Sequence, residues 1–143
     1  MQQHDQQTDA LIVKPLPTDS FELVFNARLT RVGGTHAGYG VWFSSGDRTA
    51  NLSATIRRIG DHWALVAERA GLIQTFALPD HFDPGEFRQF RFRKAGNALQ
   101  LSLALQPLGE VECESGITLL GLVCRQAAAA FDMVRVTALT RRE

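Results

Sequence analysis

Most of the chain consists of short segments in which apolar and polar residues alternate, with turn residues between the segments. In residues 21–31, Phe21 and Leu23 fall on one face of an extended strand, and Glu22 and Asn26 fall on the opposite face. Successive side chains of a strand point to opposite faces, so this alternation predicts antiparallel strands with one buried face. No segment shows the longer period of an amphipathic helix. The pattern predicts an all-β antiparallel β-sandwich of roughly ten to twelve strands, more than an immunoglobulin-type sandwich needs.

The predicted strands are separated by segments rich in Gly, Pro, Asn and Asp, and they cover residues 11–13, 21–31, 38–44, 51–58, 62–68, 72–78, 87–94, 99–105, 119–124 and 131–139. The pair Gly60-Asp61 suits a two-residue hairpin loop. Residues 79–86 are predicted to form a loop or one helical turn, and residues 107–116 are turn-like. The four alanines at 127–130 have helical composition, but four residues are too few for a stable helix.

Length and composition indicate one folded domain. The chain has 143 residues, of which 45% are hydrophobic, so it is long enough to bury a core without disulfides or metals. Residues 10–143 are assigned to a single jelly-roll β-sandwich domain, and the Gln-rich residues 1–9 to a disordered tail or a cloning remnant.

Charge and hydropathy exclude several classes of partner. Fifteen basic residues balance fifteen acidic ones, so no electrostatic attraction to nucleic acid or to an anionic membrane is expected. No run approaches the ~18 apolar residues of a membrane-spanning helix, and residues 1–9 lack the apolar segment of a secretory signal. The protein is expected to be intracellular, or to be a domain of a longer secreted protein.

Cysteine and histidine positions indicate no metal or cofactor. Cys113 and Cys124 are compatible with a disulfide between neighbouring strands, or with two reduced thiols that pack as small apolar side chains. The four histidines are scattered along the chain without the spacing of metal ligands. We therefore predict no metal site and no cofactor.

Three segments occur in an order known from a fold superfamily. They are Gly-Tyr-Gly-Val-Trp-Phe at 38–43, an alternating hairpin turned by Gly-Asn at 87–101, and Gly121-Leu122 followed by Phe-Asp-Met-Val-Arg-Val at 131–136. Together they resemble the concanavalin A-like, laminin-G-like jelly rolls over residues 19–139. The Asp-Gly that usually follows the hairpin and a calcium-binding carboxylate cluster have no counterpart here. The resemblance implies a sugar-binding or accessory domain, often attached to a glycosidase.

Strand parity defines a candidate ligand site. If the segments around residues 38–44, 51–58 and 62–68 form a meander with Gly60-Asp61 as its second loop, Trp42, Ser53 and Glu68 form one row on the outward face. An outward indole beside polar groups is suited to stack on a sugar ring while its neighbours bond the hydroxyls. The alternative is that a loop or the N-terminal segment covers Trp42, and that the polar row is only a solvated face. The candidate ligand-binding residues are Trp42, Ser53, Thr55, Arg57, Glu68, Gln89, Arg91 and Arg93.

Two further features have competing interpretations. Trp63 falls on the inward parity and is assigned to the core. On a strand, Glu110, Glu112 and Glu114 would lie on one face ~7 Å apart, a spacing near that of glycosidase carboxylate pairs. The same residues resemble the Glu-x-Asp-x-Glu strand of laminarinase-type glycosidases, with Glu112 in the Asp position. Alternatively, these glutamates are a solvated sheet edge that discourages aggregation.

Three functions follow from these features. The sequence favours a non-catalytic carbohydrate-binding or accessory module. The first alternative is a glycoside hydrolase that uses Glu110, Glu112 and Glu114. The second is a structural or protein-interaction domain without a small ligand.

Overall fold

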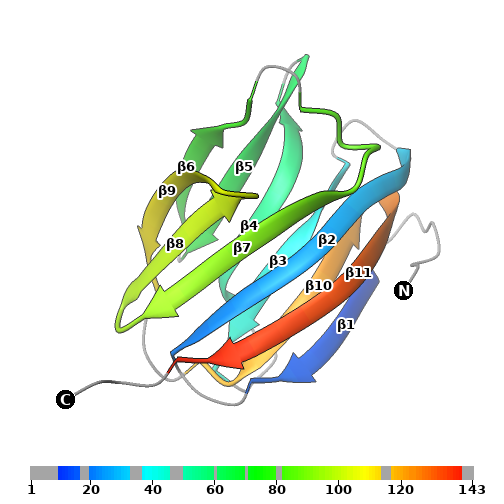
Figure 1. Cartoon of the computed structure of the whole chain (residues 1–143). Coiled ribbons are helices and arrows are strands. Elements are labelled where there is room, and N and C mark those ends of the chain that lie inside the picture. Colours follow the sequence, from blue (N-terminus) through cyan, green and yellow to red (C-terminus); the bar gives the residue numbers. More distant parts are fainter. Residues whose placement is uncertain are drawn as a thin grey trace.

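The computed structural model describes residues 10–16, 20–32, 37–45, 50–59, 61–69, 71–79, 82–113 and 117–139. These residues form eleven strands in two antiparallel sheets that pack face to face (Figure 1). None of them belongs to a helix that is long and apolar enough to cross a membrane. The predicted β-sandwich and its number of strands are therefore confirmed.

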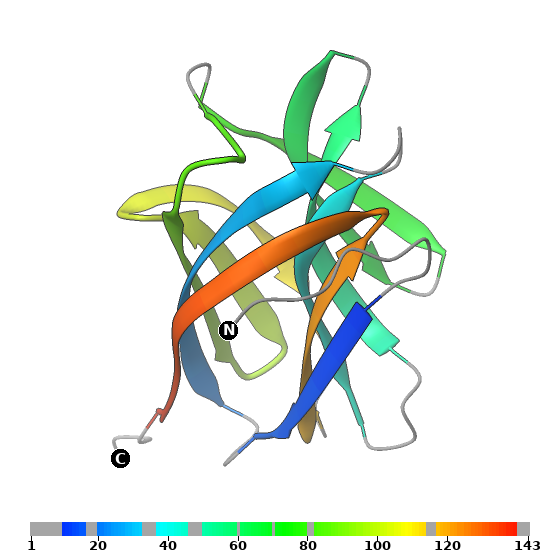
Figure 2. The same cartoon turned by 90° about the vertical axis from the view of Figure 1, so that its right-hand side faces the viewer.

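The strands are β1 (Ala10–Pro15), β2 (Phe21–Val32), β3 (Gly38–Ser44), β4 (Ala50–Ile59), β5 (His62–Arg69), β6 (Leu72–Ala77), β7 (Arg88–Ala95), β8 (Ala98–Leu103), β9 (Gln106–Glu112), β10 (Leu119–Arg125) and β11 (Ala127–Ala138). The six-stranded sheet has the order β1-β10-β3-β4-β5-β6, and the five-stranded sheet has the order β11-β2-β7-β8-β9. Strands β3 to β6 form one meander and β7 to β9 form another. The chain changes sheet before and after β2, between β6 and β7, and before and after β10 (Figure 2).

Aromatic side chains join the two sheets in the core. Phe21 of β2 lies 5.6 Å from Phe43 of β3, between ring centroids, and Tyr39 of β3 lies 6.1 Å from Phe90 of β7. Phe25 stacks on Phe90 at 5.2 Å within the five-stranded sheet. Burying one such ring stabilises a fold by about 1.5–3 kcal/mol. The side chains that the sequence pattern assigned to the inward face thus make the contacts that hold the two sheets together.

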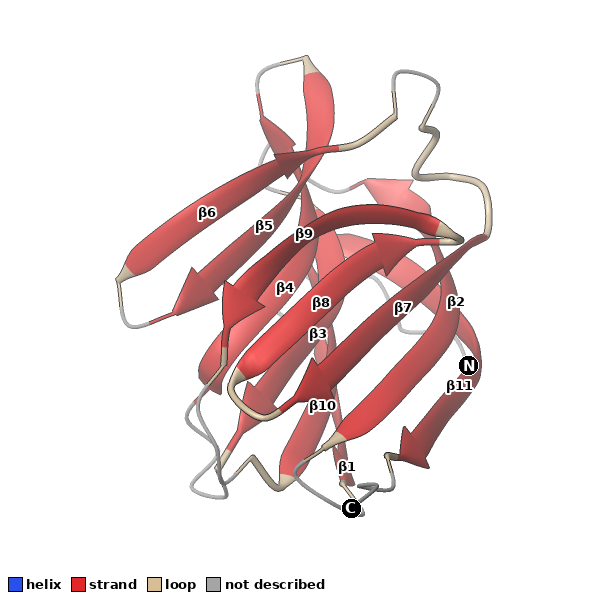
Figure 3. Cartoon of the chain, turned by 60° about the vertical axis from the view of Figure 1, so that its left-hand side comes forward, coloured by secondary structure: helices blue, strands red, loops and turns tan. Residues whose placement is uncertain are grey.

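The sheets also meet at one edge, where β6 and β9 lie side by side (Figure 3). Phe76 of β6 is half-buried against the core, and its ring occupies the space that a side chain at position 109 would need. Gly109 therefore allows the β6 and β9 edges to approach.

Residues 106–112 form strand β9, so the turn-like assignment of 107–116 is wrong for this part of the segment. Pairing with β8 explains the difference, because Val111 lies opposite Leu99 and is buried with it on the inward face. Pro107 is tolerated since β9 is an edge strand, whose outer groups need no partner strand. The preceding strand β8 ends at Leu103 rather than at residue 105. Ala104, the next residue, adopts a positive φ of 54° in the turn to β9.

The alanines at 127–130 begin strand β11, which is longer than the predicted strand 131–139. Ala129 pairs with Leu29 of β2 and is fully buried, as is Ala127 at the start of the strand. Pairing with β2 thus overrides the helix preference of alanine.

Cys113 and Cys124 are buried in the core and form no disulfide, so the alternative of two reduced cysteines is the one observed. Among the described residues, no group of three His, Cys, Asp or Glu side chains is placed to hold a metal ion.

Tyr39, the only tyrosine of the chain, is fully buried, and its phenol oxygen has no hydrogen-bond partner in the described part of the structure. Burial raises the pKa of Tyr39 above its ordinary value of 10.0, an effect that the nearby Arg88 guanidinium opposes. The folded protein therefore keeps this phenol protonated at a pH where the unfolded chain ionises.

We expect Tyr39→Phe to leave the free energy of unfolding unchanged at neutral pH, or to raise it by about 1 kcal/mol, because the variant removes an unpaired buried hydroxyl. Above about pH 10 the unfolded wild-type chain loses the phenol proton and the folded protein does not, so this contribution to stability falls as the pH rises. The Tyr39→Phe variant has no phenol at this position, so its free energy of unfolding should not show this fall above about pH 10. Urea unfolding from pH 7 to 11 measures the difference, and phenolate absorbance that appears in the folded protein near pH 10 would contradict it.

Candidate functional site

The predicted polar row exists on the outward face of the six-stranded sheet. Trp42 of β3 lies opposite Ser53 of β4, and Ser53 lies opposite Glu68 of β5. Ile59 pairs with His62, so two residues connect β4 and β5 as predicted. The register of these three strands therefore confirms the row.

A hydrogen-bonded network occupies the centre of this face. Arg57 Nε donates to Thr55 Oγ1 at 2.8 Å, and Arg57 Nη2 donates to Glu68 Oε1 at 3.1 Å. The side chains of Arg57 and Glu68 are 28% and 43% exposed, so the ion pair is open to ligand and solvent on one side. The Thr55–Arg57–Glu68 network presents guanidinium and carboxylate groups at the surface, while the buried Thr55 hydroxyl accepts from the arginine beneath them.

Gly38 leaves space on the sheet for the side chain of Arg57. Gly38 lies opposite Arg57, and a Cβ at Gly38 would lie 3.2 Å from Arg57 Cγ and 3.0 Å from the carbonyl oxygen of Ile56. The absence of a side chain at position 38 leaves room for the arginine stem. Ala64 follows Arg57 in the same row, so both cross-strand neighbours of the arginine are small.

Trp42 is only 8% exposed, although it points away from the core as predicted. It lies outside the cluster of side chains that pack between the sheets, to which its neighbours Val41 and Phe43 belong. The expectation of an open ring for sugar stacking is therefore wrong, and the alternative of a covered indole describes the structure. Gly121 and Ser53 flank Trp42 across the strands, and these small residues leave room for the indole above the sheet.

Gln89, Arg91 and Arg93 do not join this site. They belong to β7, where Gln89 pairs with Asn26 and Arg93 pairs with Glu22 on the outward face of the five-stranded sheet. The grouping with Trp42 is therefore wrong. Alternation assigned these side chains correctly to an outward face, but it carries no information about which of the two sheets takes the strand.

The candidate catalytic glutamates lie at the edge of the five-stranded sheet. Glu112 Oε1 accepts a hydrogen bond from Arg69 Nη1 at 3.1 Å, and Glu110 Oε1 lies 3.5 Å from Gln100 Nε2. Glu114 lies outside the described residues. Glu110 and Glu112 do not line the pockets of about 630 Å³ and 440 Å³ found among the described residues. They share a face as predicted, and both are exposed.

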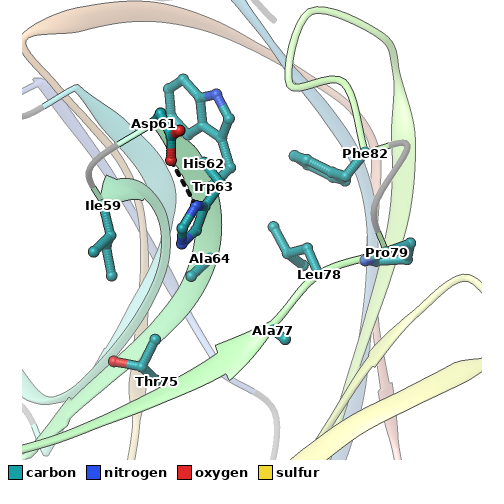
Figure 4. A pocket seen from close by; sticks show the side chains of 10 residues that line it. All are labelled: Ile59, Asp61, His62, Trp63, Ala64, Thr75, Ala77, Leu78, Pro79 and Phe82. Atoms are coloured by element: carbon teal, nitrogen blue, oxygen red, sulfur yellow. Dashed lines mark hydrogen bonds and ion pairs between the residues drawn. The ribbon is translucent and has the colours of Figure 1, made fainter.

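A pocket of about 630 Å³ adjoins the polar face where β5 begins and β6 ends (Figure 4). Strands β4, β5 and β6 and the segment that follows β6 contribute its lining: Ile59, Asp61, His62, Trp63, Ala64, Thr75, Ala77, Leu78, Pro79 and Phe82. Its volume falls in the range of small-molecule sites. Most of the lining side chains are apolar. His62 and Asp61 add hydrogen-bonding groups to the wall, and both are largely exposed, with His62 Nδ1 2.9 Å from Asp61 Oδ1.

The sequence analysis missed this pocket because it assigned Trp63 entirely to the core. Trp63 is half-buried, packs against the core and also lines the pocket. A signal was present, since Trp63 directly follows the turn at Gly60-Asp61 and thus lies at a strand end. Phe82 gave no comparable signal, because its place depends on the course of the loop after β6.

Comparison with protein-family models and with curated proteins finds no match. Solved structures do match. The carbohydrate-binding module CBM66 from Bacillus subtilis superimposes with a TM-score of 0.65 at 14% identity, covering 96% of this chain and 86% of that one. A tetrameric galectin from the ball sponge Cinachyrella sp. gives 0.70 at 11% identity, covering 90% and 99%. An alginate lyase from Pseudomonas aeruginosa gives 0.64 at 16% identity, covering 85% and 66%.

The fold is the concanavalin A-like jelly roll. The predicted jelly-roll β-sandwich is thereby confirmed, and the likeness covers 96% and 90% of the chain in the first two structures. At identities of 9–16% these likenesses establish the fold alone. The ligand has to be argued from the side chains of this chain.

We expect Trp42→Ala to lower the free energy of unfolding by about 3–5 kcal/mol, as for other buried Trp side chains, because the indole is covered rather than open. Arg93→Ala, an exposed change on the other sheet, is the control and should stay within about 0.5 kcal/mol of the wild type. Urea unfolding followed by circular dichroism measures both. A loss below about 1 kcal/mol for Trp42→Ala would show that the indole contributes little to packing.

Proposed function

We propose that this domain is a non-catalytic carbohydrate-binding module whose ligand lies on the outward face of β4 and β5. Ser53, Arg57 and Glu68 contact the sugar in this proposal, and the buried Thr55 holds the Arg57 guanidinium in place. Trp42 lies in one row with Ser53 and Glu68 on the same face but is covered, so it has little ring surface to offer a ligand.

The Thr55–Arg57–Glu68 network is the observation that carries the proposal. Neighbouring hydroxyls of a sugar both donate and accept hydrogen bonds, and the network presents donors and acceptors side by side. Each member is already held by another, so less side-chain freedom is lost on binding. The ion pair is also close to neutral as a unit, which suits an uncharged ligand.

The fold supports the same conclusion. Two of the similar structures are described as a carbohydrate-binding module and a galectin, and both superimpose over at least 90% of this chain. The Cinachyrella galectin is matched over 99% of its own length, so the likeness covers that whole chain. A domain of this fold therefore has precedents in proteins named for sugar binding.

The test is a glycan array with the wild type and two variants. Arg57→Met keeps the aliphatic stem and removes the guanidinium, and Glu68→Gln keeps the shape and removes the charge. Loss of a hydrogen bond to a charged group costs about 1.5–3 kcal/mol, so we expect affinity for the selected glycan to fall about 10- to 100-fold. Arg93→Ala, on the opposite face of the sandwich, is the matched control and should bind as the wild type does.

Other results would favour the alternatives. Glycan binding that survives both variants would move the site elsewhere on the domain. Cleavage of a glucan, xylan or alginate that is lost in Glu110→Gln or Glu112→Gln would favour an enzyme. If no glycan on the array binds and no polysaccharide is cleaved, a structural or protein-interaction domain is favoured.

A further inference from the structure

The pocket at the end of β5 and β6 reaches the outward face of the Thr55–Arg57–Glu68 network through Ala64, Thr75 and Ala77, while Trp63, Leu78 and Phe82 line it from the side that packs against the core. Arg57 of β4 pairs with Ala64 of β5, and Ala64 pairs with Ala77 of β6. Both alanines line the pocket. Strands lie about 4.8 Å apart, so the row from Arg57 to Ala77 spans about 10 Å.

Small side chains keep this path open. Ala64 and Ala77 carry single methyl groups, and Thr75, also in the pocket wall, is exposed. No large side chain therefore stands in the row between Arg57 and the pocket. A ligand that contacts the network can extend into the pocket along the sheet without displacing protein.

The lining of the pocket differs from the network in chemistry. Trp63 and Phe82 contribute aromatic rings from β5 and from the segment after β6, and Leu78 and Pro79 add apolar surface (Figure 4). The Asp61–His62 pair and Thr75 add hydrogen-bonding groups. A sugar ring matches this combination, because it has an apolar C–H face and a rim of hydroxyl groups.

The charges in the wall narrow the class of sugar. Among the described residues that line the pocket there is one carboxylate, Asp61, and no lysine or arginine. The nearest part of the network, Arg57, is paired with Glu68. Within the described lining, a phosphate, sulfate or uronate group would meet the Asp61 carboxylate and no lysine or arginine, whereas a neutral sugar carries no charge for that carboxylate to repel.

We propose that the pocket is a second subsite of the same site, and that the ligand is a neutral oligosaccharide of at least two units. One unit lies on the Thr55–Arg57–Glu68 network and the next enters the pocket against Trp63 and Phe82. This inference rests on the proposed function and goes beyond it, since it specifies the length and charge of the glycan.

The test is an affinity series with neutral cello-, manno-, galacto- and fructo-oligosaccharides of one to four units, with oligouronates of the same lengths beside them. Affinity should rise from one unit to two or more for a neutral series, and Phe82→Ala should weaken the longer sugars about 2- to 10-fold while leaving the single unit unchanged. Phe87→Ala is the matched control, because Phe87 is also partly exposed but lies over Arg28 rather than in the pocket.

Fluorescence gives a second readout. The chain has two tryptophans, so Trp42→Phe leaves Trp63 as the only reporter. Emission of this variant should change with two or more units and stay constant with one. The same titrations of wild-type protein and of Phe82→Ala by calorimetry do not depend on the stability of Trp42→Phe.

Equal affinity for one and several units would overturn the inference, as would a length dependence that Phe82→Ala leaves intact, or tighter binding of oligouronates. In these cases sugar binding itself stands and the proposed function survives. If no sugar of any length binds the wild-type protein, the proposed function fails and the second subsite fails with it.

Discussion

The antiparallel register of β3, β4 and β5 determines which side chains of this domain reach the surface together. A shift of one residue along β4 would turn Ser53, Thr55 and Arg57 into the core and expose Leu52, Ala54 and Ile56. Burial of those apolar side chains against the five-stranded sheet therefore holds the polar network in place. The network lowers the stability of the fold little, because its side chains lie on a face of the sheet that already points to solvent.

The two outward faces of the sandwich have different properties. On the six-stranded sheet, a neutral hydrogen-bonded network leads over small side chains to a pocket with aromatic walls. On the five-stranded sheet, Arg93 stands in a row with Glu22 and Gln100, and Arg91 lies 3.9 Å from Glu22 between charged atoms. Neither arginine lines the pockets of about 630 Å³ and 440 Å³ found among the described residues. The first face thus combines hydrogen bonding with concavity, as a ligand site requires.

Alternation in the sequence was sufficient to predict the strands, the inward residues and the row Trp42, Ser53 and Glu68, since these depend only on local parity and one short hairpin. It failed where the answer depends on distant parts of the chain. The sheet that contains β7, the burial of Trp42 and the pocket wall at Phe82 are all set by tertiary packing. The prediction left the alanines of β11 outside a strand for the same reason, because their partner β2 lies about a hundred residues earlier in the sequence.

The central claim is that one face of the sandwich binds sugar and the other does not. Amide chemical shifts of isotope-labelled protein, followed during titration with neutral oligosaccharides, test it most directly. We predict that the largest shifts fall on β4, β5 and the end of β6, around Arg57, Ala64 and Ala77, while β2 and β7 stay unchanged. Shifts confined to the outward face of β2 and β7 would contradict it.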